Sequence, residues 1–166
     1  MKSTFRATGQ TGILITGHGV PLDAVIADFM AGSVEYLTPD NDDDHWDIIE
    51  GQGSLFHVSY SGVTMALIHG GQPDALILSH EPMRTHMRGL PGFTPPSLEV
   101  LRDTALPLAR VANPSCQIAG ITVNTQHMSK DEAQAYLSNV EDRMGLPTVD
   151  PFRNNADRLA DALAAL

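Results

Sequence analysis

The alternation of apolar, strand-like runs with helix-like segments constrains the fold of this chain more than any other feature of its sequence. Residues 75–78 read Ala-Leu-Ile-Leu, so a strand formed here would be apolar on both of its sides. Such a strand is typical of a parallel sheet whose two faces are both covered by helices. Further strand-like runs occur at residues 4–7, 46–49, 118–123 and 148–150, the last of which we expect at a sheet edge. The sequence therefore predicts an α/β domain assembled from βαβ units.

The helices expected between these strands are recognised from the residues that begin them. Pro21 suits the first turn of a helix, because the φ angle that its ring fixes is already helical. Ser129 and Glu132 have the spacing of a capping box, which satisfies free backbone N–H groups at the start of a helix. We predict helices from Pro21 to Leu37, over residues 62–69, from Ser97 to a bend or end at Pro107, from Ser129 onward, and over residues 155–166.

Length and charge narrow the class of protein. The 166 residues suffice for one domain with its own core, and no repeat or linker divides them. A net charge of −10 argues against a nucleic-acid partner, since phosphate binding relies on clustered Lys and Arg. No apolar run is long enough to span a bilayer, no signal-peptide pattern precedes the first strand, and Cys116 is the only cysteine. We therefore expect a cytoplasmic protein with a small-molecule substrate and no membrane or nucleic-acid partner.

The segment Glu50–Ser54 places a carboxylate and a glycine-rich turn directly after the strand at residues 46–49. Loops at the carboxyl ends of parallel strands face the ligand crevice of α/β proteins. A carboxylate there can hold Mg²⁺, activate a nucleophile or act as a base, and glycines let backbone N–H groups approach an anion. The alternative is a tight turn in which the glycines only allow positive φ and Glu50 is solvated. We predict that Glu50 is catalytic, that Gln52 and Ser54 bind substrate, and that Gly51 and Gly53 bind a cofactor.

The segment His80–Gly89 follows the strand at residues 75–78 and carries acid–base and cationic side chains. Pro82 and the six-residue spacing of the two histidines exclude a helical pair of zinc ligands, so we expect no metal. Arg84 and Arg88 can bind planar anions bidentately through their guanidinium groups. The alternatives are a metal held by the loop's histidines and glutamate, or plain exposed charges. We predict His80 with Glu81 as an alternative base, and Arg84, His86 and Arg88 as substrate-binding residues.

A small-residue turn, Thr8-Gly9-Gln10-Thr11-Gly12, follows the first strand-like run. Its backbone N–H groups and hydroxyls can cradle an anion, and the alternative is a turn without a ligand. The cofactor-binding residues predicted here are Thr8, Gly9, Gln10, Thr11 and Gly12.

Four blocks of the sequence together resemble one protein family: Ala7–Gly12, Asp23–Phe29, Asp44–Phe56 and His80–Gly89. The family was long known as a domain of unknown function with a P-loop-like C-terminal domain, and it includes the D-glutamate N-acetyltransferases. The resemblance covers nearly the whole chain from about Thr4. It implies a transferase of D-amino acid metabolism that takes acetyl-CoA as its co-substrate.

The chain departs from this family at its beginning. Family members resemble two-domain proteins, in which a Rossmann-like half precedes a P-loop domain that opens with a strand, a Gly-Lys-Thr loop and a helix. Lys2-Ser3 has no glycine loop before it, and nothing fits G-x-x-x-x-G-K-[ST]. The resemblance therefore implies that residues 1–166 form a single P-loop-NTPase-like, dethiobiotin-synthetase-like domain. We expect a three-layer, mostly parallel sheet that lacks its first strand and Walker A loop.

Three functions follow from these residues and this resemblance. The first is D-glutamate N-acetyl transfer, which needs a base for the amine, cations for the carboxylates and donors for the thioester oxyanion. The second is an ATP-dependent ligase or kinase-like P-loop enzyme, with Asp47 or Glu50 on Mg²⁺. The third is an inactive fragment that needs a missing Rossmann-like half, in cis or in trans. Because an unpaired strand edge invites association, we also expect a homo-oligomer.

Overall fold

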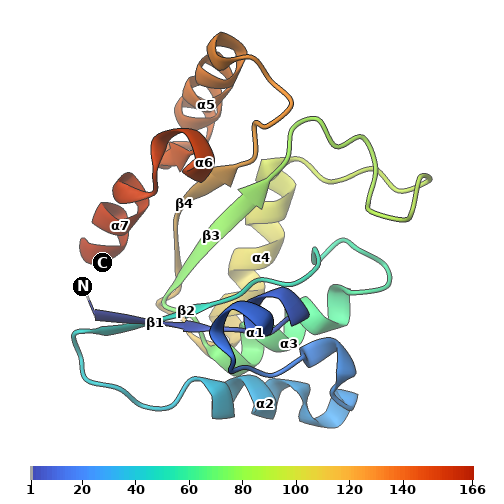
Figure 1. Ribbon diagram of the computed structural model, residues 1–166, viewed down its shortest axis with the longest axis vertical. Coiled ribbons are helices and arrows are strands. Elements are labelled where there is room, and N and C mark those ends of the chain that lie inside the picture. The colour runs from blue at the N-terminus through green and yellow to red at the C-terminus, as the bar shows by residue number, and fades with distance from the viewer. Residues whose placement is uncertain (1) are drawn as a thin grey trace. The chain divides into compact units, whose positions relative to one another are not determined.

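The computed structural model describes residues 2–166, which divide into two compact units (Figure 1). Unit 1 consists of residues 2–73 and Leu108–Pro114, and unit 2 consists of Asp74–Pro107 and Ser115–Leu166. Each unit contains a parallel sheet with helices, so the predicted α/β class is confirmed. That residues 1–166 form a single α/β domain stays a prediction.

Unit 1 is built on the parallel pair β1–β2, in which Thr4 lies opposite Asp47 and Phe5 opposite Ile48. Its core consists of Leu22, Val34 and Leu67, which come from the segments that connect and follow the two strands. In chain order the unit contains β1 (Lys2–Arg6), α1 (Gln10–Thr16), the 3₁₀ helices η1 (Leu22–Ala24) and η2 (Ala27–Phe29), α2 (Met30–Leu37), β2 (His45–Ile49) and α3 (Ser61–Gly71).

Two sequence predictions in unit 1 were wrong. The single helix predicted from Pro21 to Leu37 is α-helical only from Met30, because Val25 and Ile26 adopt extended backbone between the two 3₁₀ helices. Leu22 reaches the core from a 3₁₀ helix, where it is fully buried, so apolar spacing alone overstated the helix. The turn predicted at residues 8–12 is also shorter than expected, because α1 already begins at Gln10.

Unit 2 is built on a parallel sheet with the strand order β3-β4-β5, which confirms the segment at residues 148–150 as a sheet edge. His80 ends β3, Thr125 follows β4 and Asp150 follows β5, so these three residues lie at the carboxyl ends of their strands. In chain order the unit contains β3 (Ala75–His80), α4 (Leu98–Ala112, which enters unit 1 at Leu108), β4 (Gln117–Val123), α5 (Lys130–Met144), β5 (Thr148–Val149), α6 (Pro151–Asn154) and α7 (Asp157–Ala164).

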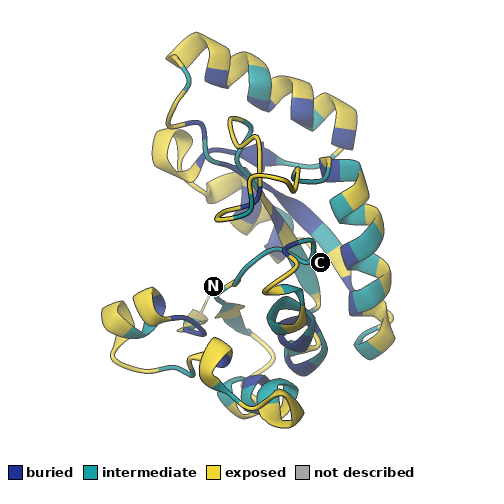
Figure 2. Ribbon diagram, turned by 90° about the vertical axis from the view of Figure 1, so that its right-hand side faces the viewer, coloured by how far each residue is buried: buried dark blue, intermediate teal, exposed yellow. Residues whose placement is uncertain are grey.

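Helix α5 shows how the sequence specifies one buried face. The predicted capping box is confirmed: Ser129 Oγ accepts from Glu132 N at 3.3 Å, and Glu132 Oε2 accepts from Ser129 N at 2.9 Å. The buried residues of α5 recur every three or four positions and form one stripe along the helix (Figure 2). These residues are Ala133, Leu137, Val140 and Met144.

Two further predictions in unit 2 concern where helices end. Of the bend or end that was predicted at Pro107, the end is excluded, because α4 continues through Pro107 to Ala112. The division between the two units does fall at this proline. The closing helix predicted at residues 155–166 is confirmed as α7, and the short helix α6, which the sequence did not predict, ends before it at Asn155, whose φ is 73°.

Gly70 allows a close approach between the backbones of α2 and α3. A Cβ atom at Gly70 would lie 2.2 Å from the carbonyl oxygen of Ala31, so α2 and α3 could not pack as they do. Gly62, in the same helix, has nothing within 4 Å of its Cβ position.

We expect Gly70→Ala to lower the free energy of unfolding by about 1–3 kcal/mol, and Gly62→Ala to be neutral or to raise it by up to about 1 kcal/mol. Urea unfolding of both variants measures this, and equal effects would contradict the packing argument.

Candidate functional site

The predicted site residues fall into two groups, one in each unit. The group around Glu50 and the small-residue turn lies in unit 1, and the group on the His80–Gly89 loop lies in unit 2. The geometry of each group shows which side chains still have atoms available for a ligand.

The Glu50 carboxylate ties the turn after β1 to the end of β2. Its Oε2 atom accepts hydrogen bonds from the backbone N–H groups of Thr8 and Gly9, both at 2.9 Å. The Thr8 hydroxyl donates to the Glu50 carbonyl at 2.7 Å and accepts from Gln52 Nε2 at 3.0 Å. Thr8 is fully buried. The structure therefore brings together four of the predicted residues: Glu50, Thr8, Gly9 and Gln52.

The glycines of this group make room for protein atoms. A Cβ atom on Gly12 would lie 2.3 Å from Glu50 Oε2, and one on Gly9 would lie 2.5 Å from Gln52 Nε2. The N–H groups that we expected to cradle a cofactor anion at Thr8 and Gly9 therefore already bind a carboxylate of the chain itself. Gln10 and Thr11 are exposed in the first turn of α1.

The remaining predicted residues of unit 1 lie on the turn after β2. Gly51 is exposed, whereas Gly53 packs against Tyr60 and accepts a hydrogen bond from the Thr64 hydroxyl. Ser54 Oγ accepts from Phe56 N at 3.1 Å. Gly53 and Ser54 therefore shape the turn that leads into α3.

In unit 2, His80 is held by a side chain that the sequence analysis did not single out. His80 Nε2 lies 2.8 Å from Tyr136 Oη, and the two rings are nearly parallel, at 16°, with centroids 6.0 Å apart. Burial lowers the pKa of His80 below its ordinary value of 6.5, Arg143 lowers it further, and Glu81 raises it in part. His80 is therefore neutral at pH 7 and able to accept a proton.

The predicted substrate-binding side chains of the loop differ in their hydrogen bonds and ion pairs within the chain. Arg84 pairs with Glu81, with its Nε atom 2.9 Å from Glu81 Oε2. His86 Nδ1 donates to the Met87 carbonyl at 2.8 Å, and Met87 is the buried residue of the loop. Arg84, His86 and Arg88 are all exposed. The loop therefore presents its predicted substrate-binding side chains to solvent, and Arg84 and Glu81 form one ion pair.

A second network in unit 2 was also missed, and it repeats the arrangement around Glu50. Asp150 Oδ2 accepts from Thr125 N at 3.1 Å and from the Thr125 hydroxyl, and Oδ1 accepts from Phe152 N at 2.9 Å. Burial opposes ionisation of Asp150, but hydrogen bonds from Thr125 and Phe152 outweigh it and hold the pKa of the carboxyl below its usual value. The signal was present in the sequence, because Asp150 directly precedes Pro151 as a helix N-cap does.

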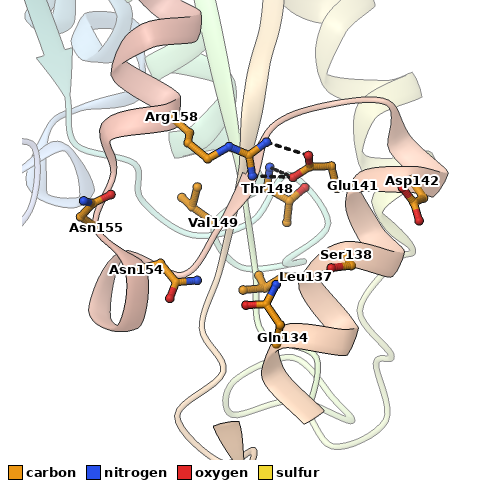
Figure 3. A pocket seen from close by; sticks show the side chains of 10 residues that line it. All are labelled: Gln134, Leu137, Ser138, Glu141, Asp142, Thr148, Val149, Asn154, Asn155 and Arg158. Carbon is orange, nitrogen blue, oxygen red and sulfur yellow. Dashed lines mark hydrogen bonds and ion pairs between the residues drawn. The ribbon is translucent and has the colours of Figure 1, made fainter. Parts of the chain in front are cut away.

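A hollow in unit 2 lies between α5, β5, α6 and α7, with a volume of about 190 Å³ (Figure 3). Its charged groups are largely paired with each other, because Arg158 donates to both oxygens of Glu141, at 2.8 and 2.6 Å. Glu141 also accepts from Thr148 N at 3.2 Å. None of the predicted site residues lines this hollow, and its central ion pair joins α7 to α5.

Membrane-spanning helices and metal clusters would be other kinds of functional feature in residues 2–166. No helix in this part of the chain combines the length and apolar character needed to cross a membrane. Within the same residues, no three His, Cys, Asp or Glu side chains are grouped so that they could hold a metal ion.

The fold and these groups define an α/β protein whose ionisable side chains cluster at the carboxyl ends of parallel strands. The chain belongs to the family described as Domain of unknown function (DUF1611_C) P-loop domain, which its residues 1–160 match.

Relatives and a solved structure agree with this family. The chain is 79% identical over all of its 166 residues to a D-glutamate N-acetyltransferase of Tritonibacter scottomollicae, of which it covers 50%. It is 48% identical over 155 residues to a D-glutamate N-acetyltransferase of a Pseudoalteromonas species, of which it covers 47%. A crystal structure of a DUF1611 family protein from Anabaena variabilis matches 99% of the chain, with a TM-score of 0.91 and 36% identity. The chain spans about half the length of each of these proteins.

Removing the Glu50 carboxylate should destabilise unit 1. Glu50→Ala leaves the N–H groups of Thr8 and Gly9 without their acceptor, and we expect a loss of about 2–4 kcal/mol in the free energy of unfolding. Glu50→Gln keeps one acceptor oxygen and should cost about 1 kcal/mol. The matched control is Glu35→Ala, an exposed acid on α2 that should change stability by less than about 0.5 kcal/mol. The denaturant midpoints of the three variants measure these changes in stability. A Glu50→Ala midpoint equal to that of Glu35→Ala would show that the hydrogen bonds from Thr8 and Gly9 to Glu50 do not stabilise the unit.

Proposed function

We propose that this chain forms part of an enzyme that transfers the acetyl group of acetyl-CoA to the amino group of D-glutamate. The observation that carries the proposal is the 79% identity, over the whole chain, to a protein named D-glutamate N-acetyltransferase. The chemistry of the His80–Gly89 loop supports it, because the loop combines a neutral imidazole with guanidinium groups.

The imidazole suits the first requirement of the reaction, the removal of a proton from the substrate ammonium. An amino acid carries its amine mainly as the ammonium ion near neutral pH, and only the neutral amine attacks a thioester. A base with a pKa near or below neutrality remains unprotonated and available under these conditions. His80 fits this description at pH 7. The Glu50 oxygen Oε2 is instead engaged by two backbone N–H groups. We therefore propose His80 as the base, with Glu50 as the alternative.

The guanidinium groups suit the second requirement, the recognition of two carboxylates. A guanidinium binds a planar carboxylate through two parallel hydrogen bonds, whereas an ammonium offers only a point charge. Arg84 and Arg88 are exposed on the loop that begins at His80. In the present structure Glu81 accepts the Arg84 hydrogen bonds, and a substrate carboxylate would compete for the same donors. The acetyl-CoA contacts predicted at residues 8–12, Gly51 and Gly53 stay predictions.

We further propose that the activity needs polypeptide beyond this chain, namely a Rossmann-like half in cis or in trans. Phe5 and Ile48 pair in the β1–β2 register and remain 44% and 39% exposed. Parallel sheets normally have both faces covered, so this apolar pair supports a covering partner. Homo-oligomer formation and a cytoplasmic location also remain parts of the proposal.

The proposal is tested by offering D-glutamate and acetyl-CoA to the chain, and to a chimera in which it replaces the matching half of the Tritonibacter scottomollicae relative. We expect the chimera to release free CoA thiol and to form N-acetyl-D-glutamate, as measured by thiol titration and mass spectrometry. If the unaltered relative acetylates D-glutamate but neither the chain nor the chimera does, the proposal is overturned. ADP release from ATP would instead support the ATP-dependent alternative.

The identity of the base is tested by two substitutions in the chimera. We expect His80→Gln to lower kcat about 10²- to 10⁴-fold with little change in KM, and Glu50→Gln in a folded protein to lower it far less. Because His80 must be unprotonated and its pKa is lowered, kcat should fall only below the pH at which a free histidine titrates, ordinarily 6.5. The control His18→Gln changes an exposed histidine and should leave kcat unchanged. A larger loss in Glu50→Gln than in His80→Gln would transfer the role of base to Glu50.

Substrate recognition is tested by Arg84→Lys and Arg88→Lys. Each should raise KM for D-glutamate about ten-fold, since lysine cannot make the bidentate contact, and should change KM for acetyl-CoA only slightly. Arg102→Lys is the matched control, because Arg102 is an arginine of unit 2 that also donates to a neighbouring carboxylate, that of Asp103. A rise confined to acetyl-CoA would make the loop a clamp for CoA phosphates, and no effect on either substrate would exclude it from binding.

A further inference from the structure

His80 is anchored through one ring nitrogen only. Its Nε2 atom lies 2.8 Å from Tyr136 Oη, and this hydrogen bond orients the imidazole, whose plane is nearly parallel to the tyrosine ring. Tyr136 projects from α5, whereas His80 ends β3, so the contact joins two elements that are 56 positions apart in sequence. A helix and a strand that both pack into the core of unit 2 therefore fix the position of the ring.

The other ring nitrogen remains available. Among residues 2–166, His80 Nδ1 has no hydrogen-bond partner. The atom is also not fully buried, since His69 Nε2 is the side-chain atom of these residues that is both buried and without a partner. Solvent therefore reaches Nδ1. Since His80 lies at the carboxyl end of a parallel strand, a ligand in that position could reach Nδ1 as well.

The hydrogen bond at Nε2 determines what Nδ1 can do. A neutral imidazole carries one N–H hydrogen, so donation from Nε2–H to Tyr136 Oη leaves a lone pair on Nδ1. In the opposite case, the tyrosine hydroxyl donates to Nε2 and Nδ1 carries the hydrogen, which would make Nδ1 a donor. Only the first arrangement presents a base, and it persists after protonation because imidazolium also donates from Nε2.

We propose that Tyr136 is a positioning residue, whose hydroxyl holds His80 as the Nε2–H tautomer and so presents Nδ1 to the ammonium group of an amino-acid substrate. This inference rests on the proposed acetyl transfer and deepens it by naming the atom that takes the proton. Tyr136 acts through His80 and needs no contact with the substrate.

The substrate nitrogen loses two protons in this step. The ammonium gives one proton to Nδ1, and the neutral amine then attacks the thioester carbon. As the C–N bond forms and the C–S bond breaks, the nitrogen loses its second proton and the CoA sulfur leaves with the electron pair of the C–S bond. One of the two protons ends on the CoA thiol, and the other passes from the imidazolium to solvent.

The charges around the pair favour a neutral resting state. Arg143, on α5, and Glu99, on α4, form an ion pair at 2.7 Å, and both act on Tyr136, together with burial, which raises its pKa most. Arg143 also lowers the pKa of His80, and Glu81 opposes it from the loop. Both members of the pair are therefore uncharged at pH 7, as a hydroxyl acceptor for Nε2–H requires.

The test is ¹⁵N NMR of the histidine ring nitrogens in the chain as it exists, in the wild type and in Tyr136→Phe. The wild type should show His80 as the Nε2–H tautomer, with a bare Nδ1. Tyr136→Phe keeps the ring but removes the acceptor, so the two tautomers should mix and the His80 titration should move to lower pH, because imidazolium loses a hydrogen bond. Tyr36→Phe removes the hydroxyl of a tyrosine that is 83% exposed and should change neither.

A wild-type Nδ1–H tautomer, or a Tyr136→Phe spectrum identical to that of the wild type, would overturn the proposal. These measurements need no activity, so they separate a wrong role for Tyr136 from a wrong reaction. In the active chimera, Tyr136→Phe should lower kcat about ten-fold and leave KM for D-glutamate unchanged. An unchanged kcat and pH profile of Tyr136→Phe in the chimera would also overturn the proposal. If the NMR spectrum of Tyr136→Phe changes as expected but the wild-type chimera transfers no acetyl group, only the proposed function is refuted.

Discussion

The structure depends on how backbone N–H groups are satisfied where parallel strands end. Beyond the last ladder pair, the chain turns away and its donors lose their strand partner. Both units supply the missing acceptor in the same way. In unit 1, Thr8 follows β1 and its backbone N–H donates to the carboxylate of Glu50, the residue directly after β2. In unit 2, Thr125 follows β4 and its backbone N–H donates to the carboxylate of Asp150, the residue directly after β5. Both threonines are fully buried, so water cannot replace the carboxylates without opening the turn.

Because these carboxylates bind backbone N–H groups, the predicted site residues differ in whether they still have atoms available for a ligand. The Oε2 atom of Glu50 already accepts from Thr8 N and Gly9 N, so these two N–H groups are satisfied within the chain. The end of β3 differs, because the residue there is His80, and its partner is a tyrosine hydroxyl instead of a backbone group. A side chain bound at one end and open at the other can exchange protons without disturbing the fold. In the proposed acetyl transfer, this imidazole would take the proton of the substrate ammonium.

Local signals in the sequence predicted the strands, the α5 capping box and the loop that follows β3, because each depends on neighbouring residues. The helix predicted from Pro21 failed because Leu22 and Val25 have helical spacing but pack into the core from 3₁₀ and extended backbone. The partner of His80 could not be predicted, since Tyr136 is 56 residues away and nothing near it marks a site. Residue chemistry thus identified ionisable groups, and only the fold showed which of them were already bound.

The contact between Gly12 and Glu50 has a consequence for how this family can diverge. Any side chain at position 12 would overlap the Glu50 carboxylate, because even a Cβ atom would lie 2.3 Å from Oε2. A homologue could therefore carry alanine at this position only if its acidic residue were shorter or had withdrawn from the turn. The two positions should co-vary, although they lie 38 positions apart in sequence. A relative with a side chain at position 12 would then have an open anion cradle where this chain has a closed one.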